Sequence, residues 1–512
     1  MTGRWFPLGL VAVATVVGAW ARIALAASSG LWRDEVQSLA VSRLPTLSEM
    51  FSFLVQEESH PPLFYLLERA WTSVVGTSDV AIVGLGLIPG ILLVPAVALV
   101  AWRSSGPPAA VLVAWLVALA WPAVRHAGDG RPYALLSLLA VGATAAALTA
   151  VRRPGPRPWT ALSACSITLV YTHNWALLVV TSLALLTLLA AWRDAATRRP
   201  QFQRWGASFG VVAVAWLPWV PAVIRQARHA GYPPPAAFPV EWLVVLPILL
   251  LAVTVHLIVP TALALGIGAW GRRPSESRPD PARFFALAAL LPALLAAAAW
   301  PVTDLTLAHC AEMLAPLMLV AIAFLLTRQG VGLRRGLVAG VAFSAILAAA
   351  TLTWRLEKSN LRDVAELVSA EVAEGDLVII FPSTLAPSFR RYATVEVEVL
   401  TFPPRGDSGP TRFSKYVESY EDPAMLAPIL DRISAPGMAT RRVWLVSQLW
   451  NGAIGDLAAA VGTRERWRLN YDERLREIGD SLRATNGLPE LIFPPADDIY
   501  VRERVRVERY GS

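Results

Sequence analysis

The sequence has little of what several protein classes require. It contains only two cysteines, Cys165 and Cys310, in 512 residues, which excludes a disulfide-stabilised scaffold. Charged residues make up 16% of the chain, whereas an average soluble protein carries roughly 25%. The CxxC, HExxH and P-loop signatures are missing, so the sequence gives no support to a nucleotide-powered transporter.

Apolar residues account for 55% of the chain, which is too many for a disordered protein. Residues 1–357 carry 25 basic and 15 acidic side chains, and residues 358–512 carry 20 and 23. The positive charges form short clusters between long apolar runs rather than one basic face, which argues against nucleic acid as a partner. We therefore predict a membrane domain over 1–357 and a smaller extracytoplasmic domain over 358–512.

Spanning a bilayer takes roughly 20 apolar residues in a helix. On this basis we predict an α-helical polytopic membrane domain with about eleven transmembrane helices. They are expected near residues 5–27, 79–101, 109–123, 132–150, 159–172, 174–191, 206–224, 241–270, 284–300, 311–327 and 336–354.

The placement of arginine orients these helices. With the N-terminus in the cytoplasm, 16 arginines lie at cytoplasmic ends and seven at outer ends, in line with the positive-inside rule. An odd number of spans then puts the C-terminal domain outside. The segment 24–26 resembles a signal-peptidase site, but cleavage there would leave the following loop outside as well. Acidic residues favour the outer side, 11 against three, so we expect the chemistry there.

The longest loop of the membrane domain, residues 28–78, lies on this outer side. Apolar residues recur at helical spacing over 36–44 and 63–74, which predicts two amphipathic helices along the membrane surface. Asp34 and Glu35 stand where the first span leaves the bilayer. Two interpretations are open: acids that stabilise a helix N-terminus, or a general base at the boundary between water and lipid.

Four short motifs follow one another on the outer face. They are LWRDE at 31–35, SHPPLFY at 59–65, GRPYAL at 130–135 and YTH at 171–173. In this order and spacing, the chain resembles the bacterial membrane glycosyltransferases of the protein-mannosyltransferase-like superfamily over roughly residues 1–190. These are the GT-C fold enzymes that include the protein O-mannosyltransferases and the aminoarabinose transferases of lipid A. Residues 361–379 are similar to the start of the outer domain that some members carry.

The resemblance implies a helical bundle with a cavity that opens to the outer face, and a sugar on a polyprenyl phosphate as donor. It implies that Asp34 is the catalytic base, with Glu35 as a secondary candidate. A polyprenyl phosphate is a good leaving group, so one carboxylate suffices for displacement with inversion. The released phosphate needs cationic donors, and Arg131 is the predicted one, with Tyr133 as a hydrogen-bond donor.

Further candidates are His60, Asp129 and His173. His60 can contact the phosphate or orient Asp34. Asp129 can pair with Arg131 or bind the acceptor. His173 lies at the outer boundary of a span, where it can contribute to the same site.

A structural interpretation stays open beside each functional one. Arg131 can be a snorkelling arginine, and Tyr133 can be a residue of the interfacial aromatic belt. His60 can be a turn residue that caps the following helix, and His173 can be a structural residue at the membrane boundary. His126 is a weaker candidate of the same kind.

The sequence departs from the family pattern at a late span. Relatives often carry an Arg-Tyr pair there, whereas this chain has Glu312. Either Arg225, Arg228 or His309 supplies the positive charge instead, or the donor binds in a different position. The acids and histidines of the outer face are ligand types that suit a divalent metal, but no spacing demands one. We therefore predict no required metal or other cofactor.

The residues from 358 onward have the pattern of a small α/β domain. Strands are expected at 376–381, 442–447 and 500–509, and helices at 359–374, 385–392, 424–434, 452–461 and 463–483. This domain contains no catalytic constellation, and no G-x-G-x-x-G follows its first strand.

The sequence thus predicts an inverting glycosyltransferase that moves a sugar from a polyprenyl-phosphate donor to a lipid, glycan or protein hydroxyl. The alternative is a non-enzymatic carrier of lipid-linked sugars, or an assembly scaffold of the cell envelope. Arginine outnumbers lysine 43 to 2, which is typical of a GC-rich bacterial genome and favours the bacterial plasma membrane as location.

Overall fold

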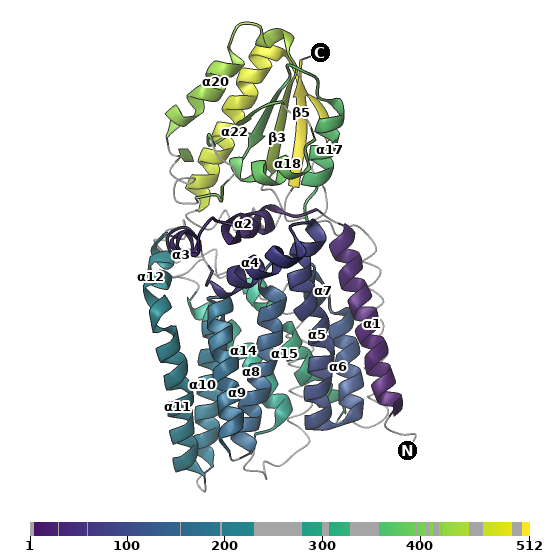
Figure 1. Cartoon of the computed structure of the whole chain (residues 1–512), viewed down its shortest axis with the longest axis vertical. Coiled ribbons are helices and arrows are strands. Elements are labelled where there is room, and N and C mark those ends of the chain that lie inside the picture. Colours follow the sequence, from purple (N-terminus) through teal and green to yellow (C-terminus); the bar gives the residue numbers. More distant parts are fainter. Residues whose placement is uncertain are drawn as a thin grey trace. The chain divides into compact units, whose positions relative to one another are not determined.

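The computed structural model describes residues 5–28, 30–58, 60–153, 155–194, 197–229, 279–299, 307–327, 358–394, 397–405, 409–412, 419–420, 422–449, 464–493 and 504–511. The chain forms two compact units. One comprises residues 1–26, 59–224 and 246–354, and the other comprises residues 27–58, 225–245 and 355–512 (Figure 1). Neither unit is continuous in sequence, because the segment before His60 groups with the C-terminal part of the chain.

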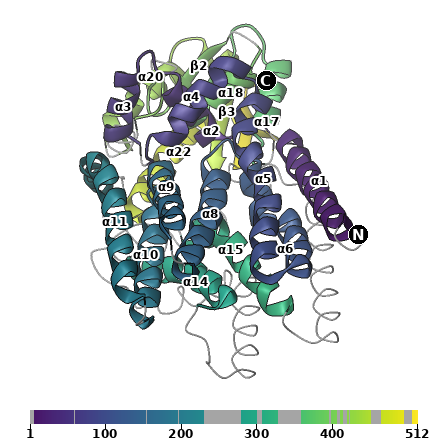
Figure 2. The same ribbon diagram turned by 60° about the horizontal axis from the view of Figure 1, so that its bottom comes forward.

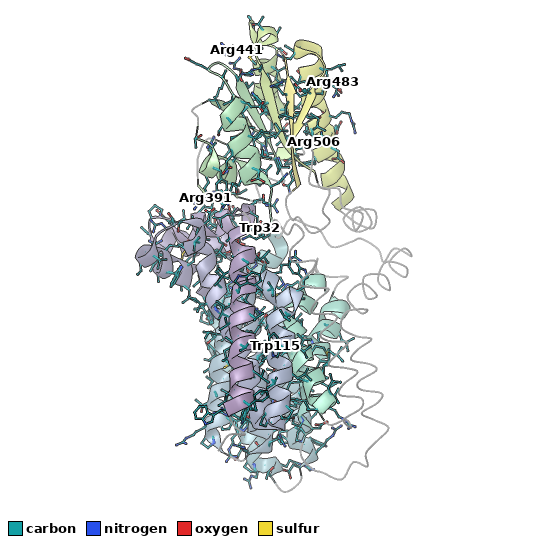
Figure 3. All side chains as sticks on the ribbon, turned by 90° about the vertical axis from the view of Figure 1, so that its right-hand side faces the viewer. Trp32, Trp115, Arg391, Arg441, Arg483 and Arg506 are labelled. Atoms are coloured by element: carbon teal, nitrogen blue, oxygen red, sulfur yellow. The ribbon has the colours of Figure 1, made fainter. Side chains whose placement is uncertain are left out.

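The first unit is built of helices (Figure 2). Their bounds are α1 (Trp5–Ser28), α4 (Leu63–Val75), α5 (Asp79–Ser105), α6 (Pro107–Leu119), α7 (Trp121–Ala127), α8 (Tyr133–Arg152), α9 (Pro156–Thr172), α10 (Ala176–Arg193), α11 (Arg198–Trp216), η1 (Leu217–Trp219), α14 (Pro281–Ala299) and α15 (Leu307–Thr327). A further helix, α12 (Val220–His229), continues from η1. One apolar core joins α5, α6, α8, α9, α10, α14 and α15, and Trp115 packs against it (Figure 3).

The predicted spans that fall in the described residues coincide with helices. By length and composition, five described helices can cross a membrane, or six if α6 and α7 form one span that is bent by 59°. The protein is accordingly a multi-pass membrane protein. The spans expected at 241–270 and 336–354 lie outside the described residues, so the count of eleven stays a prediction.

The break between α6 and α7 is held by a buried arginine. Arg22 on α1 is fully buried, and its guanidinium donates hydrogen bonds to the carbonyl oxygens of Ala118 and Val117 at 2.9 and 3.0 Å. These carbonyls belong to the last turn of α6, whose acceptors have no partner within the helix. Arg22 therefore satisfies the end of α6 at the point where the chain turns into α7.

The second unit contains a five-stranded sheet in the order β2-β1-β3-β5-β4. The strands are β1 (Leu377–Phe381), β2 (Glu398–Thr401), β3 (Val443–Leu449), β4 (Glu490–Phe493) and β5 (Arg504–Tyr510). The first three are parallel to one another, and β5 runs antiparallel to both β3 and β4.

Helices cover both faces of this sheet. They are α17 (Leu361–Glu371), α18 (Ala386–Tyr392), α20 (Ala427–Ile433) and α22 (Arg464–Asn486), with short 3-10 turns η2 (Ser383–Leu385), η3 (Pro423–Leu426) and η4 (Met438–Thr440). Alternate residues of β1 enter different cores: Val378 and Ile380 pack with α17 and α18, and Leu377 and Ile379 pack with α20 and α22. A strand buried on both faces explains the continuous apolar run in the sequence.

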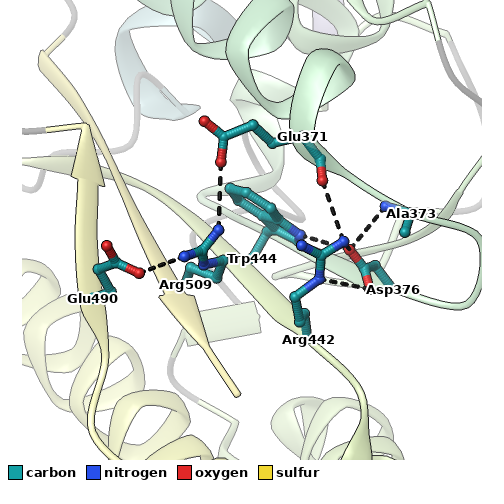
Figure 4. A network of polar contacts seen from close by, with 7 residues as sticks. All are labelled: Glu371, Ala373, Asp376, Arg442, Trp444, Glu490 and Arg509. Carbon is teal, nitrogen blue, oxygen red and sulfur yellow. Dashed lines mark hydrogen bonds and ion pairs between the residues drawn. The ribbon is translucent and has the colours of Figure 1, made fainter. Parts of the chain in front are cut away.

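A polar network lies where β1 and β3 begin (Figure 4). Asp376 accepts a hydrogen bond from the Trp444 indole at 3.0 Å and forms an ion pair with Arg442 at 3.0 Å. Arg509 bridges Glu371 and Glu490 beside the same tryptophan. These contacts tie α17 and three strands together.

Most elements expected in the C-terminal region coincide with observed ones, apart from 452–461, which lies outside the described residues. The sequence did not indicate β2 or β4, which are four residues long each. The domain boundary expected at residue 357 stays a prediction. The two compact units divide the chain at several positions, and residues 27–58 group with the C-terminal part.

The second unit also contains two helices from the outer loop, α2 (Arg33–Ser42) and α3 (Leu47–Gln56). The helices expected at 36–44 and 63–74 correspond to α2 and α4, but α3 was not predicted. It begins with a capping box: Thr46 accepts from the backbone N–H of Glu49, and the Glu49 carboxylate accepts from the N–H of Thr46. This T-x-x-E pattern is a recognisable start signal.

Candidate functional site

In the helical unit, four sequence candidates come together from three separate segments. His60 lies before α4, Arg131 and Tyr133 lie where α8 begins, and His173 follows α9 directly. The His60 and His173 rings are edge to face with centroids 4.8 Å apart, and the Tyr133 ring lies 6.0 Å from His173. The predicted motifs at 59–65, 130–135 and 171–173 therefore meet in space.

Arg131 lies at the centre of this group. Its Nη2 atom is 3.4 Å from both ring nitrogens of His60. The Arg131 side chain is only 4% exposed, and it does not extend into water as a snorkelling arginine would. A guanidinium beside imidazole rings and a phenol is a donor set that suits a phosphate oxyanion.

The tautomer of His173 follows from its contacts. Its Nδ1 atom accepts a hydrogen bond from the backbone N–H of Trp175 at 3.1 Å. A neutral imidazole that accepts at Nδ1 carries its proton on Nε2, so His173 can act as a donor there. The turn that follows α9 thus fixes the orientation of the ring.

Asp129 lies in the turn between α7 and α8, and it is fully buried. Its Oδ2 atom is 3.5 Å from Nδ1 of His126, whose ring lies 5.0 Å from that of Tyr133. His126 is thus one partner of Asp129, and the expected pairing of Asp129 with Arg131 stays a prediction. The sequence ranked His126 only as a weaker candidate; its position three residues before Asp129, in the last turn of α7, was the signal.

Two glycines on α5 allow this turn to approach. A Cβ atom at Gly86 would lie 2.1 Å from the carbonyl oxygen of Asp129, and one at Gly90 would lie 2.3 Å from the Cβ of Ala127. Both distances are shorter than any real contact, so only glycine fits with the present backbone. The spacing of four residues puts both glycines on the face of α5 that receives the turn.

The acidic pair belongs to the second unit, where its two members have different surroundings (Figure 3 labels the adjacent Trp32). Glu35 is fully buried. Its carboxylate accepts from the backbone N–H of Trp32 at 3.0 Å and from Nζ of Lys358 at 2.8 and 3.1 Å. Asp34 has a 28% exposed side chain, and its Oδ1 lies 3.1 Å from Nε of Arg33.

The two acids therefore differ in their contacts, and the catalytic role of either one stays a prediction. Both acids lie in the first turn of α2, where negative charge favours the helix dipole. Glu35 caps the helix and neutralises Lys358, so its two oxygens are engaged in structural contacts. Asp34, in contrast, is partly exposed.

The residues considered at the missing Arg-Tyr pair lie on two helices. Glu312 and His309 lie on α15, and Arg228 lies on α12, but their side chains fall outside the described residues. Arg225 is exposed on α12. Within the described ranges, no three His, Cys, Asp or Glu side chains are grouped so that they can hold a metal ion.

The fold is that of the GT-C membrane glycosyltransferases, as the sequence resemblance predicts. The chain is similar to the crystal structure of ArnT from Cupriavidus metallidurans bound to undecaprenyl phosphate, with 14% identity, a TM-score of 0.56, and 99% of this chain and 98% of that chain covered. The apo structure of the same ArnT gives a TM-score of 0.54 at the same identity and coverage.

Archaeal oligosaccharyltransferase AglB from Archaeoglobus fulgidus is a more distant match, with 12% identity, 91% and 72% coverage and a TM-score of 0.49. No family model and no curated protein matches the sequence. At these identities the similarity concerns the fold alone.

Proposed function

We propose that the protein is a glycosyltransferase that moves a sugar from a polyprenyl-phosphate donor to an acceptor hydroxyl on the outer face of a bacterial plasma membrane. The observation that carries the proposal is the group of Arg131, His60, His173 and Tyr133 in a GT-C fold, in which all but His60 are buried. A similar chain, ArnT, has been crystallised with undecaprenyl phosphate, which is a ligand of this chemical class.

The donor phosphate would be held by the phosphate-binding cluster, which consists of Arg131, His60, His173 and Tyr133. Arg131 would bind two phosphate oxygens through its planar guanidinium, and the Nε2 proton of His173 and the Tyr133 hydroxyl would donate to the remaining oxygens. Negative charge accumulates on the leaving phosphate as its bond to the sugar breaks. Preorganised donors therefore stabilise the transition state more than the bound donor.

Asp34 would act as the base. It takes the proton of the acceptor hydroxyl as the hydroxyl oxygen forms a bond to the anomeric carbon from the opposite side. The bond between that carbon and the phosphate oxygen breaks, and its electron pair leaves with polyprenyl phosphate. The sugar is inverted, and no protein-bound intermediate forms. Glu35 holds the helix rather than the proton.

The test is release of polyprenyl phosphate from a panel of polyprenyl-phosphate sugars, with a membrane extract as the source of acceptor. The full-length wild-type protein is compared with Asp34→Asn and with Glu49→Gln, a control on the same loop whose amide can still cap α3. Release from one donor that Asp34→Asn abolishes and Glu49→Gln preserves supports the proposal.

Two outcomes would overturn it. Full activity of Asp34→Asn would remove the assigned base. Binding of donors without release, in the presence of extract, would identify a carrier or scaffold that retains the fold.

A further inference from the structure

The helix that carries Asp34 is fixed by residues that lie more than 300 positions later in the sequence. Three contacts within the second unit do this. Lys358 forms the buried ion pair with Glu35, the Tyr392 hydroxyl accepts from the backbone N–H of Leu31 at 2.7 Å, and Gln37 exchanges two hydrogen bonds with the backbone of Thr411 at 2.7 and 3.0 Å.

The ion pair is the most enclosed of these contacts. Glu35 is 0% and Lys358 is 7% exposed, and Nζ lies within hydrogen-bonding distance of both carboxylate oxygens. An unpaired charge at such a place is costly, so loss of one partner leaves the other strongly destabilised. The same carboxylate caps the first turn of α2 through the N–H of Trp32, so Lys358 holds the group that caps this helix.

Lys358 is itself anchored to the sheet. Two residues later, the Asn360 amide donates to the carbonyl oxygen of Val505 at 2.7 Å and accepts from the Val505 N–H at 3.0 Å. Val505 lies on β5. A short chain of buried contacts therefore leads from β5 through Asn360 and Lys358 to Glu35, and from there to the neighbouring Asp34.

Backbone packing supports the same connection. A Cβ atom at Gly30 would lie 3.0 Å from the Cβ of Arg362 and 3.2 Å from the Tyr392 hydroxyl. The segment directly before α2 thus passes close to α17 and α18. Five residues of the C-terminal region surround or support the start of α2: Lys358, Asn360, Arg362, Tyr392 and Thr411.

We propose that the C-terminal domain is a positioning element for the base, and that Lys358 is its main positioning residue. The inference rests on the proposed role of Asp34. A general base must lie within hydrogen-bonding distance of the hydroxyl that it deprotonates, and a shift of about 1 Å can cost on the order of 100-fold in rate. The domain therefore contributes to turnover without contributing a group that touches the substrate.

The test separates turnover from donor binding. Lys358→Met is expected to lower kcat about 10- to 100-fold with an unchanged KM for the donor, because the phosphate-binding cluster keeps its residues. Lys358→Arg keeps the positive charge and is expected to restore most of kcat. The double variant Glu35→Gln with Lys358→Met removes both charges and leaves an amide that can still cap α2, so it is expected to be no slower than Lys358→Met alone.

A control variant accounts for loss of stability. Arg442→Met breaks the ion pair with Asp376 in the same domain, in contacts that do not involve α2. It is expected to lower Tm without changing kcat. If Lys358→Met does not fold, Tyr392→Phe removes the hydroxyl that accepts from Leu31 and serves as the milder variant, with a several-fold loss in kcat expected.

The outcomes distinguish the two proposals. If Asp34→Asn is inactive while Lys358→Met and Tyr392→Phe keep full turnover, the positioning role is wrong and the assigned base stands. If Asp34→Asn is fully active, the proposed function itself fails. If Arg442→Met lowers kcat as much as Lys358→Met does, the loss reflects general stability, and the positioning role is likewise overturned.

Discussion

The helical unit and the second unit hold their candidate residues by different means. In the helical unit, Arg131 follows a turn that packs closely against glycine residues of α5, and its guanidinium lies beside the His60 ring. In the second unit, Glu35, the neighbour of Asp34, forms a side-chain ion pair with Lys358. The first arrangement follows from packing inside one bundle, and the second joins segments that are far apart in the chain.

The difference shows why neighbouring residues of one motif can have separate roles. Asp34 and Glu35 occupy the same helical turn, yet one is partly exposed and the other fully buried. Lys358 pairs with Glu35, whereas Asp34 lies beside Arg33. A sequence motif therefore does not show how the surroundings of its neighbouring residues differ.

The largest expected effect comes from replacing each of these two acids by its amide. Asp34→Asn should lower kcat about 1000-fold, within the range known for loss of a general base, without changing the KM for the donor. Glu35→Gln should lower kcat less, about as much as Lys358→Met, because an amide still caps α2 although Lys358 loses its charge partner. Release of polyprenyl phosphate under single-turnover conditions measures both. Equal losses in the two variants would show that the comparison between the two acids is mistaken.

The next largest effect is expected from substitutions in the phosphate-binding cluster. Arg131→Met should lower kcat/KM about 10- to 100-fold, since hydrogen bonds to charged groups are worth about 1.5–3 kcal/mol. Arg131→Lys should recover only part of this loss, because an ammonium cannot bind two oxygens in parallel. Binding of polyprenyl phosphate alone, measured for the full-length protein, checks the same residue without turnover. Unchanged binding in Arg131→Met would place the phosphate elsewhere.

The glycine contact gives a third prediction. Gly86→Ala forces a methyl group against the carbonyl oxygen of Asp129, and it should destabilise the protein by about 1–3 kcal/mol and weaken donor binding. Gly142→Ala is a matched control on α8, because its Cβ would lie 3.7 Å from the Sγ of Cys165, an ordinary contact. Thermal unfolding and donor binding of the two variants measure the difference. Equal Tm and equal donor binding in the two variants would mean that the turn at Asp129 moves to make room for the methyl group.

A good part of this architecture could be predicted from the sequence for clear physical reasons. Apolar runs of span length indicated the helices, and the continuous run at 377–381 indicated the central strand. The outer-face motifs named His60, Arg131 and His173, which the structure brings together. Local pattern sufficed because each of these features depends on a few neighbouring residues.

The remaining features depend on contacts that local pattern does not encode. Lys358 is one of only two lysines, but its pairing with Glu35 spans 323 positions. His126 ranked low as a histidine at a membrane boundary, and only the fold shows its ring beside that of Tyr133. Strands β2 and β4 were missed because four residues carry too little periodicity.

The smallest expected effect comes from an exposed ion pair that contrasts with the buried pair of Lys358. Arg432 donates to both carboxylate oxygens of Glu398 at 2.7 and 2.6 Å, and these hydrogen bonds hold the pKa of Glu398 below its usual value. The two side chains are 28% and 40% exposed. Exposed pairs are worth about 0–1 kcal/mol, so Arg432→Ala should change stability within this range.

The direction with pH follows from the lowered pKa of Glu398. A carboxyl group whose pKa falls on folding stabilises the folded state above its unfolded pKa, and this contribution is lost as the pH falls through the folded value. Hydrogen exchange of β2 and α20, followed in wild type and Arg432→Ala from neutral to acid pH, should therefore differ slightly at neutral pH and converge in acid. A loss of stability in Arg432→Ala at neutral pH as large as that in Lys358→Met would show that burial does not distinguish the exposed ion pair from the buried one.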